Sequence, residues 1–199
     1  MLRALQKRFY QKYKAAGVAR RLKKRRFGLV IDTLGITPPD RVLEVGCSTG
    51  ADFMQFAVAA GFTCHGVDIQ PQPRLCDFEF TQGNACALPF PDQYFDAAVS
   101  IGVFEHIQPI EDLCRAAAEI RRVSQRYCIV VPAISTLLEP HTMQLLWALR
   151  ARSGKHPRHG SLNYYADDVW LKFTAFQDAH LKRFSYMPGV RNLMIYGTH

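Results

Sequence analysis

The chain has 199 residues, a mass of 22.6 kDa and a formal net charge of +8 at pH 7. Its hydrophobic fraction of 48% and charged fraction of 21% are those of a folded globular chain, which excludes wholesale disorder. No apolar run approaches the about 18 residues that a membrane-crossing helix needs, and the first 20 residues lack the apolar core of a secretory signal. We therefore expect one cytoplasmic domain over residues 1–199.

The positive charge is concentrated at the start of the chain. Eleven Lys and Arg residues precede the first acid, Asp32, whereas the rest of the chain has more acidic than basic residues. Apolar residues at helical spacing predict one helix over residues 2–15 and a second over 20–34. Residues 1–36 are therefore predicted to form a basic helical arm before a near-neutral domain.

The middle of the chain alternates between strand-like and helix-like segments. Strands are predicted at 41–45, 63–68, 78–81, 95–100 and 126–131, with helices at 52–60 and 109–125. Such alternation is typical of a parallel α/β sheet. After Pro132 the pattern predicts helices at 140–152 and 166–178, then two antiparallel strands at 180–187 and 192–197 around Pro188-Gly189. The six cysteines have no C-x-x-C pair, so we expect neither a disulfide framework nor a metal site.

The first strand is followed by the segment Glu44-Val45-Gly46-Cys47-Ser48-Thr49-Gly50, which leads into a predicted helix. Glycines at such a turn let the backbone approach a ligand, and a helix N-terminus offers unpaired N–H groups to it. The alternative is a tight β-α turn without a ligand. The G-x-S-x-G spacing counts against a dinucleotide fingerprint, which needs G-x-G-x-x-G.

Asp68 ends the second predicted strand, 22 residues after Gly46. A carboxylate at this position can accept hydrogen bonds from both hydroxyls of a ribose. An acid that merely caps the next turn is the alternative. The glycine turn at the appropriate distance favours the ribose.

Several segments together resemble class I S-adenosylmethionine-dependent methyltransferases, in particular the small-molecule "type 11" branch. They are Val42–Gly50, Gly66-Val67-Asp68-Ile69, Asn84–Phe90, Phe95-Asp96, Val103–Ile107 and Glu119–Val123, so the resemblance is continuous from about Val42 to Pro132. It implies a Rossmann-like α/β fold with a seven-stranded, mostly parallel sheet and helices on both faces. The implied strand order is 3-2-1-4-5-7-6 with strand 7 antiparallel.

The resemblance also implies roles in binding S-adenosylmethionine, whose product is S-adenosylhomocysteine. Glu44, Gly46, Cys47, Ser48 and Gly50 would cradle its amino acid part. Asp68 would hold the ribose, Ile69 would lie against the adenine, and Asn84 and Ala85 would meet the adenine edge. Ser100, Ile101, Gly102 and Val103 would line the methionine side.

Two positions depart from the family pattern. Ser48 replaces the middle glycine of the turn, which is tolerable if its φ is negative. Asn84 replaces an aspartate, and its side-chain carbonyl can still accept a hydrogen bond from the adenine amino group.

Methyl transfer needs alignment of the acceptor and exclusion of water, and a general base helps when the acceptor is a hydroxyl. His106, after the fourth strand, is the first candidate base, although a histidine that only packs there is as good an interpretation. His141 is the second candidate. Histidines 65, 156, 159 and 180 are expected on the surface or in loops.

The acceptor is expected to be a small molecule such as a sugar, a lipid or a metabolite. Family members that methylate nucleobase amines carry an N-P-P-Y-like sequence where this chain has Ser100-Ile101-Gly102-Val103. Residues 133–180 are predicted to form a substrate cap. Its aromatic residues would line an acceptor pocket, form helix core, or do both; they are Trp147, Tyr164, Tyr165, Trp170, Phe173 and Phe176.

The basic arm leaves three interpretations open: a helix packed on the domain, a lid over the cofactor, or a surface for an anionic partner. Through residues 3–26 such a surface would bind lipid head groups at a membrane or RNA. Methylation of RNA or a ribosomal component, and cofactor binding without catalysis, therefore remain alternatives to a small-molecule methyltransferase.

Overall fold

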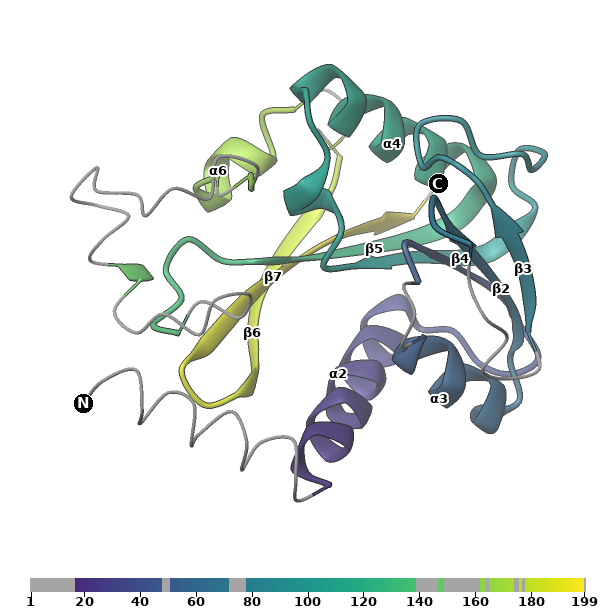
Figure 1. Ribbon diagram of the computed structural model, residues 1–199, viewed down its shortest axis with the longest axis horizontal. Helices are drawn as coiled ribbons and strands as arrows, with labels where there is room; N and C mark the ends of the chain where they lie inside the picture. The colour runs from purple at the N-terminus through teal and green to yellow at the C-terminus, as the bar shows by residue number, and fades with distance from the viewer. Residues whose placement is uncertain are drawn as a thin grey trace.

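Buried apolar strands form the centre of the molecule, a single seven-stranded sheet in the order β3-β2-β1-β4-β5-β7-β6 (Figure 1). A computed structural model describes residues 17–47, 51–71, 78–138, 147–148, 162–163, 165–173, 176 and 178–198. The strands are β1 (Arg41–Val45), β2 (Thr63–Asp68), β3 (Glu79–Gln82), β4 (Phe95–Ile101), β5 (Ser124–Pro132), β6 (His180–Met187) and β7 (Val190–Thr198). The helices are α2 (Val18–Leu34), α3 (Asp52–Ala60), η1 (Phe104–His106), α4 (Ile110–Val123) and α6 (Asp167–Trp170).

The pairing of the strands confirms the predicted topology. Strands β1 to β5 run parallel, and β7 runs antiparallel to both β5 and β6. Helices cover both faces of this sheet, which is why its central strands read as nearly continuous apolar runs. The chain has the predicted Rossmann-like fold.

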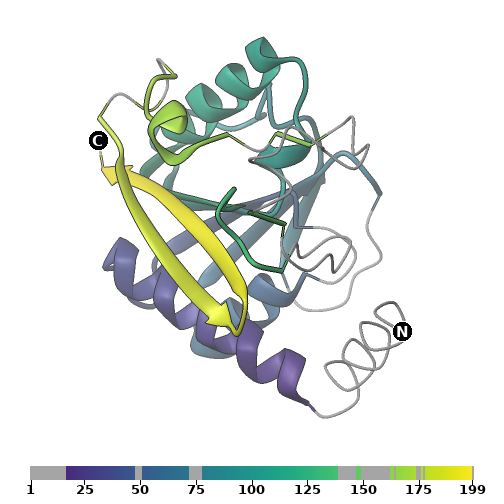
Figure 2. The same cartoon turned by 90° about the vertical axis from the view of Figure 1, so that its left-hand side faces the viewer.

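Alternation along β1 divides the core between the two faces. Val42 belongs to the same hydrophobic cluster as buried residues of α2 and α3, whereas Leu43 and Val45 belong to the cluster that includes α4. Figure 1 shows α2 and α3 together on one side of the sheet and α4 with α6 on the other. In Figure 2 the β6–β7 hairpin passes across α2. Glu44 has the same parity as Val42 and therefore belongs to the α2 and α3 side.

The predicted helix over residues 166–178 is wrong in its extent, because α6 ends at Trp170. Beyond it the backbone turns through i to i+3 hydrogen bonds, from the N–H of Phe173 to the carbonyl of Trp170 and from Phe176 to Phe173. Side chains three residues apart eclipse one another in such tight turns. Trp170 and Phe176, six residues apart, are both fully buried. In this segment the buried residues therefore follow a spacing of three and not the 3.6-residue period of an α-helix.

Two other predicted helices fall largely outside the described residues. The helix over 2–15 lies entirely outside them, and of the helix over 140–152 only residues 147–148 are described, as helical. Within the described part of the chain, no helix has the length and apolar character needed to cross a membrane.

One charged side chain ties the segment after β3 to α4. The Arg122 guanidinium donates hydrogen bonds to the carbonyls of Leu88 (2.9 Å) and Phe90 (2.7 Å) and to the Glu119 carboxylate (2.7 Å). Glu119 in turn accepts the N–H of Leu88 at 2.7 Å. These hydrogen bonds hold the irregular segment after β3 against α4.

Candidate functional site

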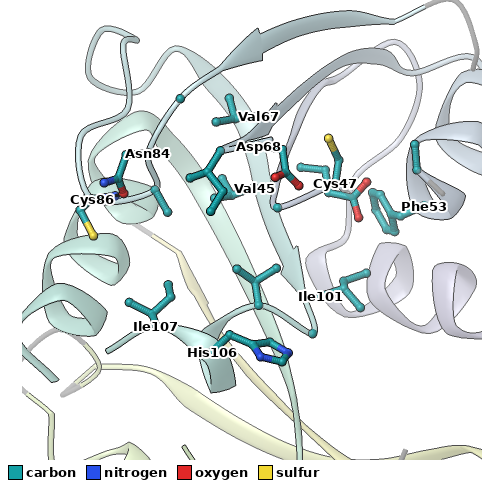
Figure 3. A pocket seen from close by; sticks show the side chains of 18 of the residues that line it. Val45, Cys47, Phe53, Val67, Asp68, Asn84, Cys86, Ile101, His106 and Ile107 are labelled. Atoms are coloured by element: carbon teal, nitrogen blue, oxygen red, sulfur yellow. Dashed lines mark hydrogen bonds between the residues drawn. The ribbon is translucent and has the colours of Figure 1, made fainter. Parts of the chain in front are cut away.

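A crevice of about 500 Å³ opens at the carboxyl ends of β1, β2 and β4 (Figure 3). In open α/β sheets ligands bind at this edge, where the strand order reverses on either side of β1. Eleven of the candidate site residues line the crevice: Glu44, Gly46, Cys47, Asp68, Ile69, Asn84, Ala85, Ile101, Gly102, Val103 and His106. The fold therefore brings most of the predicted site together.

The floor of the crevice is the turn after β1. Gly46 has φ of +78°, and its N–H donates to the carbonyl of Val67 at 2.7 Å. A Cβ at this position would lie 2.2 Å from Cγ2 of Val103, in the segment that follows β4. Both the left-handed backbone and the close approach of Val103 therefore require glycine here.

Asp68 ends β2 and Asn84 follows the neighbouring strand β3, and both lie on the same side of the crevice in Figure 3. The Asp68 carboxylate accepts the N–H of Gln70 at 3.0 Å, which fixes its orientation at the end of β2. The side-chain carbonyl of Asn84 accepts the N–H of Cys86 at 2.9 Å. This oxygen was expected to face an adenine amino group, and it already serves a local turn.

Glu44 is an acidic residue within a buried strand. It is 5% exposed, its carboxylate accepts a hydrogen bond from the backbone N–H of Met54, and its Oε2 atom is buried without a hydrogen-bond partner. Burial raises the pKa of this carboxyl to about 8, against the opposing effects of Arg26 and the Met54 N–H. An unpartnered oxygen at the wall of a crevice is suited to a hydrogen-bond donor on a ligand.

Arg26 and Asp52 also line the crevice, and neither was among the candidate site residues. The sequence spacing could have identified Arg26. It precedes the buried residues Val30 by four positions and Leu34 by eight, so it lies on the buried face of α2. A charged residue on the otherwise apolar, buried face of a helix indicates that this part of the helix lies against a polar site. The other lining residues that sequence reasoning missed are Val45, Ala51, Phe53, Val67, Gly83, Cys86, Ile107, Gln108 and Asp112.

Ser100 does not line the crevice, contrary to the expectation from the resemblance. It is fully buried in β4, where its hydroxyl donates to the carbonyl of Val45 at 2.9 Å. The residues of a strand alternate between the two faces of the sheet. The Ser100 side chain is therefore directed into the core on one face and not toward the crevice at the strand ends. Ser48, Gly50 and the candidate base His141 lie outside the described residues.

The histidines separate into distinct environments. His106 ends η1 and lines the crevice on the side away from Asp68 (Figure 3). His65 was expected on the surface, but it is half-buried in β2, with its ring nitrogens 3.1 Å from the Glu79 carboxylate and 2.8 Å from the Thr81 hydroxyl. His65 thus joins β2 to β3 and has no place in the crevice.

The aromatic residues expected to line an acceptor pocket lie mainly in the core. Trp147, Trp170 and Phe176 are buried, and Tyr165 and Phe173 pack against that core. Among these described residues none lines the crevice. Tyr164 is outside the description.

Comparison with known proteins identifies the fold family. Residues 43–130 match the model of a methyltransferase domain. The chain is 30% identical over 145 residues to demethylmenaquinone methyltransferase from Renibacterium salmoninarum, covering 65% of this chain and 59% of that protein. It is 24% identical over 176 residues to 2-methyl-6-phytyl-1,4-hydroquinone methyltransferase from Arabidopsis thaliana, covering 81% of this chain and 48% of that protein. The chain therefore spans about half to three fifths of the length of these two relatives.

A solved structure with the same fold is the 1,6-didemethyltoxoflavin-N1-methyltransferase of Burkholderia thailandensis, with bound 1,6-didemethyltoxoflavin and S-adenosylhomocysteine. The TM-score is 0.64 at 15% identity, over 98% of this chain and 86% of that one. Residues 43–130 thus match a methyltransferase domain, and the chain is similar in sequence and fold to S-adenosylmethionine-dependent methyltransferases.

The residues at this site fit S-adenosylmethionine, the cofactor of such methyltransferases. The Gly46 turn lines the crevice, and Asp68 offers a carboxylate to ribose hydroxyls. Ile69, 63% exposed at the crevice, offers an apolar surface to a planar base. The unpartnered Oε2 of Glu44 offers an acceptor to an ammonium group.

Replacing Gly46 with alanine tests the close contact with Val103. We expect Gly46→Ala to weaken S-adenosylhomocysteine binding more than about 10-fold and to lower the free energy of unfolding by more than the about 1–2 kcal/mol of a left-handed alanine. Gly35→Ala is the matched control, since Gly35 has φ of +60° and no atom within 4 Å of an added Cβ. Calorimetric titration and chemical denaturation measure the two effects. Equal losses in both variants would show that the contact has no role.

Glu44 makes the stability of the methyltransferase domain depend on pH. The unfolded carboxyl ionises near 4.5 and the folded one near 8, so between these values the native state holds more protons. The free energy of unfolding should therefore fall as pH rises from about 4.5 to 8, by up to about 1.4 kcal/mol per pH unit from this group, and level off above. Denaturation at several pH values should show that Glu44→Gln removes this slope, while the exposed-site variant Glu111→Gln retains it. An unchanged slope in Glu44→Gln would contradict the assignment.

Proposed function

We propose that the chain transfers a methyl group from S-adenosylmethionine to a small-molecule acceptor. The observation that carries the proposal is the crevice itself, where the Gly46 turn, the Glu44 carboxylate and Asp68 meet at the ends of β1 and β2. When bound, the cofactor supplies a methyl group activated by the sulfonium. The protein then has to align the acceptor and exclude water.

The chain's own residues divide this task. Asp68 holds ribose hydroxyls with a carboxylate whose orientation the Gln70 N–H fixes, and Ile69 covers the base. Ile101, Gly102 and Val103 border the crevice where β4 ends. His106 stands at the rim on an exposed turn, within reach of a molecule entering from solvent, and takes a proton from a hydroxyl acceptor.

The acceptor class is supported by the relatives. The two curated relatives reported above are named for methylation of a demethylated menaquinone and of a phytyl hydroquinone, which are small and largely apolar molecules. We propose an acceptor of this lipophilic type for this chain. Residues 133–180 remain our candidate for the segment that covers it.

Thermal denaturation with S-adenosylhomocysteine tests cofactor binding. A ligand at 100 times its dissociation constant stabilises the folded state by about 2.7 kcal/mol. Incubation with radiolabelled S-adenosylmethionine and fractionated cell extract then reveals whether label enters small apolar molecules. His106→Gln should lower the labelling rate without changing S-adenosylhomocysteine affinity.

Three results would redirect the proposal. Absence of stabilisation at millimolar ligand contradicts cofactor binding. Label in RNA or ribosomal protein favours that alternative, and binding without label in any fraction favours a non-catalytic module.

The exposed side of α2 supports a second proposal, that an anionic lipid surface brings the enzyme to a lipophilic acceptor. Arg20, Arg21, Lys24 and Arg25 are exposed, and none of them has an ion pair with another described residue. Asp32, at the end of the helix, is its single acid. Each basic residue near such a surface contributes about 1 kcal/mol.

Vesicle binding tests this surface. Replacing Arg21 and Lys24 with glutamine should weaken binding to phosphatidylglycerol-containing vesicles roughly 10- to 30-fold, because about 2 kcal/mol of attraction is lost. Replacing Arg115 and Lys172 removes the same charge from α4 and the turn after α6, on the other face of the sheet, and should have much less effect. Sedimentation with vesicles measures both. Equal losses in the two variants, or salt-sensitive binding to RNA but not to vesicles, would contradict the lipid surface.

A further inference from the structure

Arg26 is held at the wall of the crevice by contacts from two other elements. Its guanidinium lies over the ring of Tyr186 in β6, 5.1 Å from the ring centroid. Lys23, three residues earlier on the same face of α2, forms an ion pair with Asp52 at the start of α3, with N–O separation of 2.5 Å. The Tyr186 stack and the Lys23–Asp52 pair therefore fix where α2 presents Arg26.

The charge of Arg26 has no anionic partner among the described residues. Arg26 lines the crevice and is half-buried, yet it forms neither an ion pair nor a hydrogen bond to a described side chain. Glu44 lines the same crevice, and the positive charge of Arg26 acts to lower its pKa, but the two side chains form no ion pair with each other. Glu44 also retains its unpartnered Oε2.

The Arg26 guanidinium and the Glu44 carboxyl border one crevice without meeting, and together they are complementary to a molecule that carries both a carboxylate and an ammonium group. An amino acid zwitterion is such a molecule: its ammonium group suits a buried carboxylate, and its carboxylate suits a guanidinium. The Gly46 turn lines the same crevice as these two side chains. A hydrophobic or purely cationic ligand would leave Arg26 without a counter-charge in a partly desolvated place.

We propose that Arg26 binds the carboxylate of the cofactor's methionine part, opposite Glu44, which receives its ammonium group. This inference rests on the proposed function, because it assigns a further residue to the same cofactor site. It also divides the basic segment by role: Arg26 belongs to the site and Lys23 pairs with Asp52 at its wall, whereas the exposed basic residues of α2 do neither.

Calorimetric titration of the full chain with three probes tests the assignment. S-adenosylhomocysteine carries both charged groups, its decarboxylated analogue 5′-deoxy-5′-(3-aminopropylthio)adenosine lacks the carboxylate, and 5′-methylthioadenosine lacks both. Arg26→Gln should weaken S-adenosylhomocysteine binding roughly 10- to 100-fold, the range for a lost charge-assisted hydrogen bond, and should leave binding of the two other probes within about twofold. Arg26→Lys, which keeps the charge but loses the fork of donors, should give an intermediate loss.

Arg25→Gln is the matched control, because it removes the same charge from the exposed side of the same helix. It should leave all three affinities within about twofold, since the Debye length at 0.1 M salt is about 10 Å. If Arg26→Gln folds poorly, the Arg26→Lys series and the comparison of probes on the wild-type chain carry the test.

The outcomes separate the inference from the proposed function. An Arg26→Gln variant that binds S-adenosylhomocysteine as the wild type does, or that loses all three probes equally, overturns the assignment and leaves the function intact. Equal affinity of the wild type for S-adenosylhomocysteine and its decarboxylated analogue also overturns it. A wild-type chain that binds none of the probes overturns the proposed function, and the assignment with it.

Discussion

The site depends on the close approach of two backbone segments at the carboxyl ends of β1 and β4. Parallel pairing of these strands brings the turn after β1 against Val103, at a distance that leaves no space for a side chain at position 46. The same turn takes the N–H of Gly46 to the carbonyl of Val67, so it also binds the end of β2. Three strand ends are thus fixed relative to one another before any ligand enters.

Within that frame, the Glu44 carboxyl is a buried acidic group at the wall of the crevice. Glu44 is placed on the α2 and α3 side by the alternation of β1, and there it contacts the backbone N–H of Met54 near the start of α3. Removing a carboxylate from water is unfavourable unless a partner compensates, and the raised pKa expresses that cost. The helix that carries Arg26 supplies part of the compensation, which links the basic segment of the chain to the interior of the site.

Much of this arrangement could be predicted from the sequence because it follows from local periodicity and spacing. The strands β1, β2, β4 and β5, the antiparallel end of the sheet and the residues at the strand ends all have signatures of this kind. Ser100 could not be placed correctly, since a resemblance assigns a position along the strand but not the face toward which the side chain points. Arg26 was counted with a charge run, although its spacing from Val30 and Leu34 sets it apart. The extent of α6 depended on packing of Trp170 and Phe176, which no local propensity encodes.

The bonds that Arg122 and Glu119 make to Leu88 and Phe90 have a consequence for recognition. Residues 84–90 form an irregular segment, and such segments ordinarily lose conformational entropy when a ligand orders them. Here the hydrogen bonds to α4 order that segment when the protein folds. This side of the crevice therefore already has its final conformation when a nucleoside binds. Affinity at the Asn84 end of the crevice is then set by the fit of the ligand rather than by the immobilisation of the protein.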